Sequence, residues 1–437
     1  MGLNGSQDLT PTRSQHGFGV DYGTNIHTFG ENIRVAKINN LTKSESDRIG
    51  VLPSIAAVQK AIRITTPTPP RRVGITERLN RNQKFPRVSQ KEVMTNITSI
   101  GYQSKRFNLL RKRDLMINIT KSSWNLERIS SVNTVNDPTR SVADLTYTYR
   151  YMENEPGHLP GTGVDAYLLD TGLATNISNI RGRAKRLLAN LTDPDDHIGH
   201  GTMCAGVLGG THYGVSGGAN LYGIKVVGTN SSDCVDIAAA LDQIITLHKQ
   251  RLSDPTFKGS VVSMSIAYIE PTPEGFITMP EVKYPVMFEL MKEASTAGIH
   301  LVAAGGNDSQ DACIQGPAGF SRSIPLIGVG ATNVDDSRAD YSNYGPCINL
   351  YAPGTDITYQ NTAGKLATVS GTSCAAPLVA GIVAYELGRS SQFKLDPAGM
   401  RKYLVSKALK GVLTPDPNML LIYNGVDTIK KSSADIS

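Results

Sequence analysis

The 437-residue chain has little cysteine and no long hydrophobic run, and each absence removes a class of protein. Five cysteines are too few to hold together a scaffold built on disulfides, and the odd number leaves at least one thiol free unless it pairs between chains. No stretch approaches the roughly 18 to 20 apolar residues that a membrane-spanning helix needs. The first 30 residues also lack the apolar core of a signal peptide.

Acidic residues are nearly absent from residues 60–113, which contain 14 Lys or Arg but only Glu77 and Glu92. The formal net charge of +6 therefore comes from this segment. A basic run with few aromatics can bind nucleic acid, but a solvated linker or a removable pro-segment explains it better, and we expect no nucleic-acid partner. The segment ends in Arg111-Lys112-Arg113, which resembles a dibasic processing site, although such clusters are also commonly just solvated.

From about Gly163 onward, short apolar runs alternate with longer amphipathic ones, as is typical of strands joined by crossover helices. The expected strands cover 163–169, 219–227, 259–266, 299–304, 325–331 and 348–352. The expected helices cover 201–209, 234–250, 282–297, 374–389 and 396–409. The sequence thus predicts an α/β fold of three layers, doubly wound around a mostly parallel central sheet.

Two segments place reactive side chains where a strand or a helix meets a loop. AYLLDTG at 166–172 predicts a buried strand that delivers Asp170 to the carboxyl edge of the sheet, where open α/β folds build their sites. DDHIGHGTMCAGVLGG at 195–210 flanks His200 with glycines, which let the backbone approach the imidazole closely. His197 has no such neighbours and is typical of a surface histidine. Alone, Asp170 is equally explained as a turn cap.

A third segment, VSGTSCAAPLVAG at 369–381, places Ser373 at the start of an Ala-rich helix. Unpaired N–H groups and the dipole of a helix N-terminus can hold a developing oxyanion, although a plain N-cap serine would explain this segment alone. Together the three side chains fit nucleophilic acyl transfer. Ser373 attacks a carbonyl, His200 takes and returns the proton, and Asp170 orients the imidazole and stabilises its cation.

DTG, GHGT and SGTS with a following Ala-Ala-Pro resemble, in order and spacing, the signature segments of subtilisin-like serine peptidases. The resemblance runs from about residue 120 to 410, and Cys204 and the DAC segment at 311–313 are most similar to the fungal proteinase K and cerevisin branch. It implies a serine endopeptidase that acts on protein or peptide substrates and requires no cofactor for its chemistry. Structural calcium is common in the family, but the sequence picks out no ligands, and no His/Cys cluster has zinc spacing.

The resemblance also divides the chain. SSWNLERISS at 122–131 is similar to the start of the mature enzyme, so residues 1–113 are expected to be a small, partly disordered pro-segment and 114–437 the catalytic domain. Within the pro-segment, 31–67 resembles an inhibitory propeptide, and 68–113 is a basic connector. We expect the pro-segment to inhibit its own enzyme. We also expect a secreted monomer with no membrane partner, with the vacuole as the alternative location.

Two departures from the family concern the binding of the oxyanion and of the substrate. Family members have an oxyanion-binding Asn directly after Ala-Ala-Gly, whereas here Gly306 fills that position, so one glycine looks inserted and Asn307 receives the role. The family's Ser-Leu-Gly-Gly substrate strand reads Ser-Ile-Ala-Tyr, and Ala and Tyr predict either a restricted choice of P1 residue or a bent strand with a different pocket. The expected substrate-binding residues are Ser265, Ile266, Ala267 and Gly305.

The cysteines have structural rather than chemical roles in this interpretation. Cys374, directly after the candidate nucleophile, is expected to be a buried thiol that fills the space of a methionine, and Cys204 a buried free thiol beneath the histidine. Cys313 and Cys347 follow adjacent predicted strands and are the best candidates for a disulfide.

Three rival functions remain to be weighed. An aspartic protease would need a second DTG or DSG loop, which the sequence lacks. An esterase could use Ser216 in the G-x-S-x-G pattern at 214–218, but that pattern precedes a strand instead of linking a strand to a helix. The third rival is a catalytically silent binding protein of subtilisin shape, suggested by the altered substrate strand and the shifted Asn307.

Overall fold

A computed structural model of the chain describes residues 25–29, 33–37, 63–65, 115–153, 155, 157–188, 193–228, 234–269 and 280–426. They belong to two compact units, 1–58 and 59–437. The first unit contains a hairpin of two antiparallel strands, β1 (Asn25–Phe29) and β2 (Ile33–Lys37). The predicted basic connector lies outside the described residues.

The core of the second unit is a sheet of seven parallel strands in the order β13-β12-β11-β9-β6-β8-β7. The strands are β6 (Val164–Asp170), β7 (Ala184–Leu187), β8 (Asn220–Lys225), β9 (Gly259–Met264), β11 (His300–Ala304), β12 (Leu326–Thr332) and β13 (Leu350–Pro353). Every residue of β6, β9, β11 and β12 is buried, as is typical of parallel strands covered on both faces. β7 alone among these seven strands was not predicted, because its AKRL sequence contains no apolar run.

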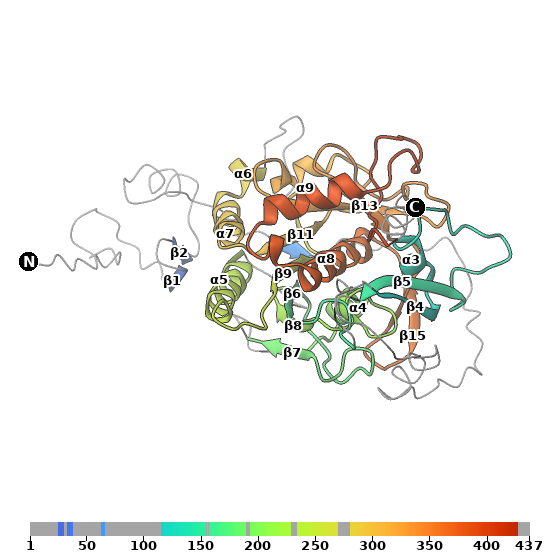
Figure 1. Ribbon diagram of the computed structural model, residues 1–437. Coiled ribbons are helices and arrows are strands. Elements are labelled where there is room, and N and C mark those ends of the chain that lie inside the picture. Colours follow the sequence, from blue (N-terminus) through green and yellow to red (C-terminus); the bar gives the residue numbers. More distant parts are fainter. Residues whose placement is uncertain are drawn as a thin grey trace, which may run out of the picture. The chain divides into compact units, whose positions relative to one another are not determined.

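Helices cover both faces of this sheet, which gives three layers (Figure 1). On one side lie α5 (Cys234–Arg251) and α7 (Pro285–Thr296), and on the other lie α4 (His200–Gly209) and α8 (Thr372–Arg389). Residues 372–387 of α8 are all buried, so this helix runs through the core with no exposed face over that length. The predicted α/β fold with a parallel central sheet is confirmed.

An antiparallel pair of strands that was not predicted from the sequence precedes the central sheet in the chain. β4 (Leu115–Ser122) pairs antiparallel with β5 (Tyr147–Glu153), and α3 (Trp124–Arg128) lies between them in sequence. The Arg128 guanidinium is buried and contacts the Asp336 carboxylate at 2.6 Å. This ion pair joins α3 to the loop after β12.

Two shorter antiparallel pairs lie outside the central sheet. β3 (Arg63–Thr65) pairs with β10 (Ala267–Ile269), and β14 (Ile357–Gln360) pairs with β15 (Leu366–Val369) just before α8. The remaining described helices are α6 (Pro280–Lys283), α9 (Pro397–Lys407) and the 3-10 helices η1 (Ala312–Ile314), η2 (Ala318–Arg322) and η3 (Ser391–Phe393). The pairing of β3 with β10 brings a segment from the predicted pro-segment onto the predicted substrate strand.

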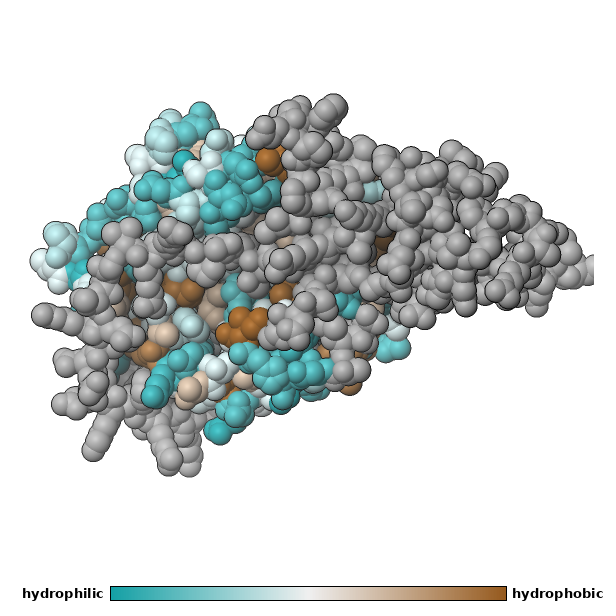
Figure 2. Space-filling model, turned by 180° about the vertical axis from the view of Figure 1, so that it is seen from behind, coloured by the Kyte–Doolittle hydropathy of each residue, from teal (hydrophilic) through white to brown (hydrophobic). Residues whose placement is uncertain are grey.

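Few large apolar side chains are exposed among the described residues. On the face that Figure 2 shows, hydrophobic residues reach the surface in separate areas among hydrophilic ones. The large apolar side chains that are exposed in the described part of the chain are Val132, Leu188, Ile198, Leu252, Tyr344 and Leu395. None of the described helices combines the length and the apolar character that crossing a membrane requires.

Candidate active site

Three neighbouring strands of the sheet, β11, β9 and β6, end at the same edge because parallel neighbours run in one direction. β6 ends at Asp170, β9 at Met264 and β11 at Ala304. Binding sites of open α/β sheets lie outside the carboxyl ends of the strands. A site is therefore expected among the side chains at and after these three strand ends.

His200 is the first residue of α4 and contacts Asp170 at the end of β6. Its Nδ1 lies 2.7 Å from Oδ1 of Asp170, and the backbone N–H of Thr171 donates to the same oxygen at 2.8 Å. The side chain of Asp170 is 2% exposed and that of His200 13%. Gly201 permits this approach, because a Cβ at that position would lie 3.2 Å from the Cβ of Asp170 and against a neighbouring backbone carbonyl.

Burial and the Asp170 carboxylate shift the pKa of His200 in opposite directions. Burial lowers the pKa of the imidazole, the carboxylate raises it, and the net pKa lies well above the ordinary value of 6.5. The Cys204 thiol lies 3.9 Å from Nδ1, and burial raises its pKa to about 12, so it carries no charge at neutral pH. The Asp170 carboxylate is therefore the group that stabilises the imidazolium.

Ser373 is the second residue of α8 and is buried. Its backbone carbonyl accepts hydrogen bonds from Oγ of Ser265, which follows β9, at 3.0 Å and from the thiol of Cys204 at 3.4 Å. Because Cys204 also lies beside His200, these contacts bring Ser373 next to the pair formed by His200 and Asp170. The Ser373 Oγ and the His200 Nε2 are both buried and have no hydrogen-bond partner among the described residues. Buried polar atoms left without a partner are rare in proteins, and a catalytic role is one of their explanations.

The Asn307 amide lies beside the N-terminus of α8. Its Oδ1 accepts hydrogen bonds from the backbone N–H and the hydroxyl of Thr372 at 2.9 and 2.8 Å, which fixes the orientation of the amide. A Cβ built on Gly371 would lie 3.3 Å from Nδ2 of Asn307, 3.6 Å from the backbone N of Ser373 and 3.8 Å from its Oγ. One small space beside Gly371 is thus surrounded by two N–H donors and the serine hydroxyl.

The expected substrate-binding residues follow the ends of β9 and β11. Ser265 anchors the carbonyl of Ser373 as described, and Ile266 and Ala267 are buried. The backbone N–H of Gly305 donates to the Val329 carbonyl at 2.8 Å. Ala267 opens β10, whose edge pairs with β3. Restricted substrate choice at this strand stays a prediction.

Asp196 was not predicted as a site residue, but its buried carboxylate accepts four hydrogen bonds. Its Oδ1 accepts from Oγ1 of Thr171 at 2.8 Å and from the backbone N–H of Gly199 at 2.7 Å. Its Oδ2 accepts from the backbone N–H and the hydroxyl of Thr202 at 2.8 and 2.6 Å. Asp196 thereby joins the residue after β6 to the first turn of α4. Its only signal in the sequence is an acidic residue four positions before the histidine.

The two rival side chains have contacts of their own. His197 is 59% exposed, and its Nε2 contacts a carboxylate oxygen of Asp193 at 2.8 Å. Ser216 is buried and donates its hydroxyl hydrogen to the carbonyl of Gly381 at 2.7 Å. His197 is thus a surface histidine, and Ser216 fastens a turn to α8.

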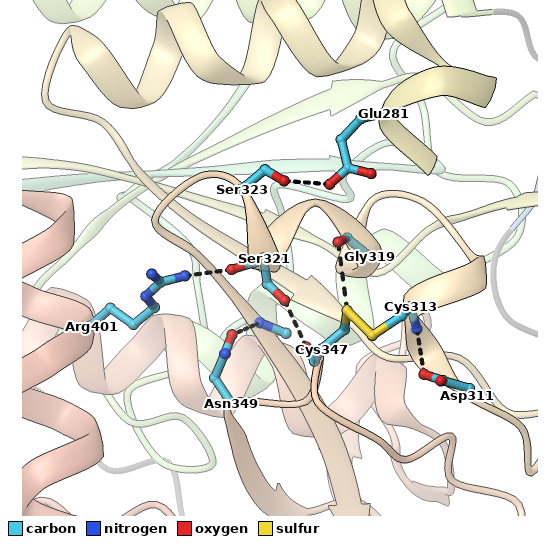
Figure 3. The surroundings of a disulfide bond; sticks show 10 residues. Glu281, Asp311, Cys313, Gly319, Ser321, Ser323, Cys347, Asn349 and Arg401 are labelled. Carbon is cyan, nitrogen blue, oxygen red and sulfur yellow. Dashed lines mark hydrogen bonds between the residues drawn. A yellow bond between two sulfur atoms is a disulfide. The ribbon is translucent and has the colours of Figure 1, made fainter. Parts of the chain in front are cut away.

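The cysteines lie as the sequence analysis expected. Cys313 and Cys347 form a disulfide with their Cα atoms 5.2 Å apart (Figure 3). Cys204 and Cys374 are free and buried, and the Cys374 thiol packs 3.8 Å from the sulfur of Met203. Burial raises the pKa of Cys374, so this thiol is not poised as a nucleophile.

Asp170, His200 and Cys204 form the single grouping of three metal-binding side chains in the described part of the chain, with ligand atoms within 4.8 Å of one another. Calcium takes six to eight oxygen ligands, and this set offers one carboxylate with a nitrogen and a sulfur. The described residues therefore provide no cluster of three carboxylates of the kind that calcium prefers.

An α/β sheet that presents Asp, His and Ser at its carboxyl edge, in this order along the chain, is the arrangement of subtilisin-like proteins. The subtilase family model matches residues 163–428, and the chain belongs to this family. A crystal structure of a cold adapted subtilisin-like serine proteinase superimposes with a TM-score of 0.53 and 28% identity, over 70% of this chain and 99% of that one.

Curated relatives are fungal proteases. The chain is 34% identical to subtilisin-like proteinase Spm1 of Pyricularia oryzae, over 73% of this chain and 59% of that protein. It is 32% identical to alkaline protease 2 of Aspergillus fumigatus, over 69% of this chain and 64% of the relative. Cerevisin of Saccharomyces cerevisiae is also 32% identical, over 72% of this chain and 49% of its own length. The chain thus spans about half to two thirds of these relatives, which belong to the expected fungal group.

Proposed function

We propose that the chain is a serine endopeptidase. The observation that carries the proposal is the contact of His200 with Asp170 beside a buried serine hydroxyl at the start of α8. In the proposed reaction, Ser373 Oγ attacks the scissile carbonyl carbon while His200 Nε2 takes its proton. Asp170 accepts the hydrogen bond from Nδ1–H and stabilises the imidazolium that forms.

The attack produces a tetrahedral intermediate with a negatively charged oxygen. We assign its binding to the Nδ2 group of Asn307 and the backbone N–H of Ser373, whose positions around one small space support this role. When the intermediate collapses, the C–N bond breaks and His200 returns the proton to the leaving amine. Water then attacks the acyl-enzyme with His200 again as base, which releases the acid and restores Ser373. The proposed chemistry uses protein groups and water, with no cofactor.

The proposed substrate is an extended peptide that adds an antiparallel strand to β10. The pairing of β3 with this edge supports the idea, since β3 is itself an extended segment in antiparallel register with β10. Ala267 in place of glycine favours a restricted choice at P1. Cleavage of Phe-P1 and Ala-P1 peptides with equal kcat/KM would contradict that restriction.

We also propose that residues 1–113 are a pro-segment that inhibits the enzyme. The support is again β3, because a segment paired with the substrate edge excludes a substrate from it. We further propose a secreted monomer, with the vacuole as the alternative. Fractionation of expressing cells would separate the two locations.

Labelling with an active-site fluorophosphonate, with intact mass recorded, tests the proposal on the full chain and its Ser373→Ala variant. We expect one label on the wild type and none on the variant, because only an activated serine reacts. A loss of N-terminal mass in the labelled sample would locate the end of the pro-segment. Absence of labelling on folded, processed wild-type protein would overturn the proposal in favour of a silent binding protein of the same shape.

A further inference from the structure

The side chain of Asn343 is fully buried and bonded to the backbone on both sides of Asn307. Its Oδ1 accepts from the backbone N–H groups of Asp308 and Gln310, both at 3.0 Å. Its Nδ2 donates to the backbone carbonyl of Gly305 at 2.9 Å. One amide therefore holds the residues before and after Asn307 at fixed separations.

The segments 305–313 and 341–347 are also joined along their main chains. The backbone hydrogen bonds run from Ser309 N to Tyr341 O, Asn343 N to Gly306 O, Tyr344 N to Gln310 O and Ala312 N to Tyr344 O, at 2.8 to 3.0 Å. The disulfide between Cys313 and Cys347 closes the end of this paired region, where the Cys313 N–H donates to the Asp311 carboxylate at 2.8 Å (Figure 3). Asn343 is the member of the second segment whose side chain reaches the loop around Asn307.

Gly306 is the residue that makes room for this amide. Its φ is +102°, and a Cβ there would overlap Nδ2 of Asn343 and lie 2.6 Å from Oε1 of Gln315, which accepts a second hydrogen bond from that nitrogen at 3.2 Å. The glycine that departs from the family pattern and the buried Asn343 thus fit each other. The extra glycine has a physical reason in this chain.

We propose that Asn343 is a positioning residue that sets the Asn307 amide for oxyanion binding. Thr372 fixes the Asn307 side chain, and Asn343 fixes the backbone that carries it. The inference rests on the proposed function, because it needs Asn307 to act on the reacting oxygen. Loss of the Asn343 contacts releases the loop, and a donor displaced by about 1 Å can lose about 10²-fold in rate.

A double-mutant cycle tests this inference on the processed enzyme. The variants are Asn343→Ala, Asn307→Ala and the double variant, with turnover of a chromogenic peptide expressed per active site titrated with a fluorophosphonate. We expect Asn343→Ala to lower kcat about 10- to 100-fold, with KM and the acid limb of the pH profile unchanged. In the Asn307→Ala background the same substitution should have almost no further effect. Equal losses in both backgrounds would show that Asn343 acts independently of Asn307.

Two further variants guard against a merely structural effect. Asn424 is a matched control, because its side chain is also fully buried and its Nδ2 also donates to a backbone carbonyl, that of Arg150 at 2.7 Å. Asn424→Ala should lower thermal stability and leave kcat unchanged. If Asn343→Ala does not fold, Gly306→Ala displaces the same amide without removing it and should reproduce the kcat loss. Wild-type kcat in Gly306→Ala would overturn the inference. Failure of the proposed function is distinct, since the wild type would then show neither turnover nor labelling.

Discussion

The candidate site has two halves that are fixed in different ways. The first half is the pair Asp170 and His200, and the second is the Asn307 amide beside the N-terminus of α8. Asp170 and His200 take their positions from their own segments, since a buried strand ends at the carboxylate and glycines flank the histidine. Asn307 lies in a loop whose position depends on Thr372 and Asn343, residues far along the chain. A side chain placed by its own motif can be recognised in a sequence, whereas one placed by distant partners cannot.

Substitution of Asp170 by Asn should give the largest effect, because it removes the charge that defines the first half. We expect kcat to fall about 10⁴-fold, since an amide favours the wrong imidazole tautomer. The reaction needs neutral His200, so activity of the wild type rises with pH through a pKa above 6.5. Without the carboxylate, burial still lowers that pKa and only the Cys204 thiol still raises it, so the acid limb should move to lower pH.

The check is the pH profile of residual kcat/KM in Asp170→Asn and in Asn307→Ala. The Asn307 variant serves as the control, because its loss should be the same at each pH. An acid limb that stays in place in Asp170→Asn would mean that the carboxylate does not set the His200 pKa, and the contrast between the two halves would fail.

A methyl group in the space beside Gly371 should disturb the proposed oxyanion site and leave the contact of Asp170 with His200 intact. In Gly371→Ala, the new Cβ would lie between the Asn307 amide and the backbone N–H of Ser373, where the oxyanion is proposed to bind. We expect kcat to fall about 10²–10³-fold with little change in KM, as for loss of an oxyanion donor. The inhibition constant of a peptide boronate, which mimics the tetrahedral state, should rise by a similar factor.

Backbone strain is the competing cause in that variant, because φ at Gly371 is +155°. Gly411 offers a matched control: its φ is +72°, and a Cβ there meets nothing within 4 Å. Gly411→Ala should therefore cost about 1 kcal/mol of folding free energy through strain and leave kcat unchanged. A similar fall of kcat in both glycine variants would contradict a specific role for the space beside Gly371.

The same contrast separates what the sequence predicted from what it did not. Six strands of the central sheet lie within two residues of the predicted ranges, because fully buried parallel strands read as continuous apolar runs. The polar edge strand β7 and the antiparallel pair β4 and β5 were not predicted, because they lack a continuous apolar run. Resemblance to a family pointed to Asn307. Nothing local pointed to Asn343, and Asp196 had only its place four positions before the histidine. The importance of both comes from partners that only the fold brings together.

Substitution of Asp196 should have the smallest effect on kcat. Its carboxylate joins Thr171, which follows β6, to Thr202 in the first turn of α4. Asp196→Asn keeps an acceptor at one oxygen but turns the other into a donor that faces the N–H and hydroxyl of Thr202. We expect a loss of about 1 to 3 kcal/mol in unfolding free energy and a fall in kcat of about tenfold, because the first turn of α4 shifts under His200.

Two readouts distinguish this positioning role from the charge effect of Asp170. Asp196 is not among the groups that shift the pKa of His200, so the acid limb of Asp196→Asn should coincide with that of the wild type. Asp137 is the matched control on the surface of the protein. Its Oδ1 accepts from the backbone N–H and the hydroxyl of Thr139, as Oδ2 of Asp196 does from Thr202. Asp137→Asn should change neither kcat nor the acid limb of the pH profile. A displaced limb in Asp196→Asn would instead show that this carboxylate acts on the imidazole through its charge, and the first half of the site would then depend on two carboxylates.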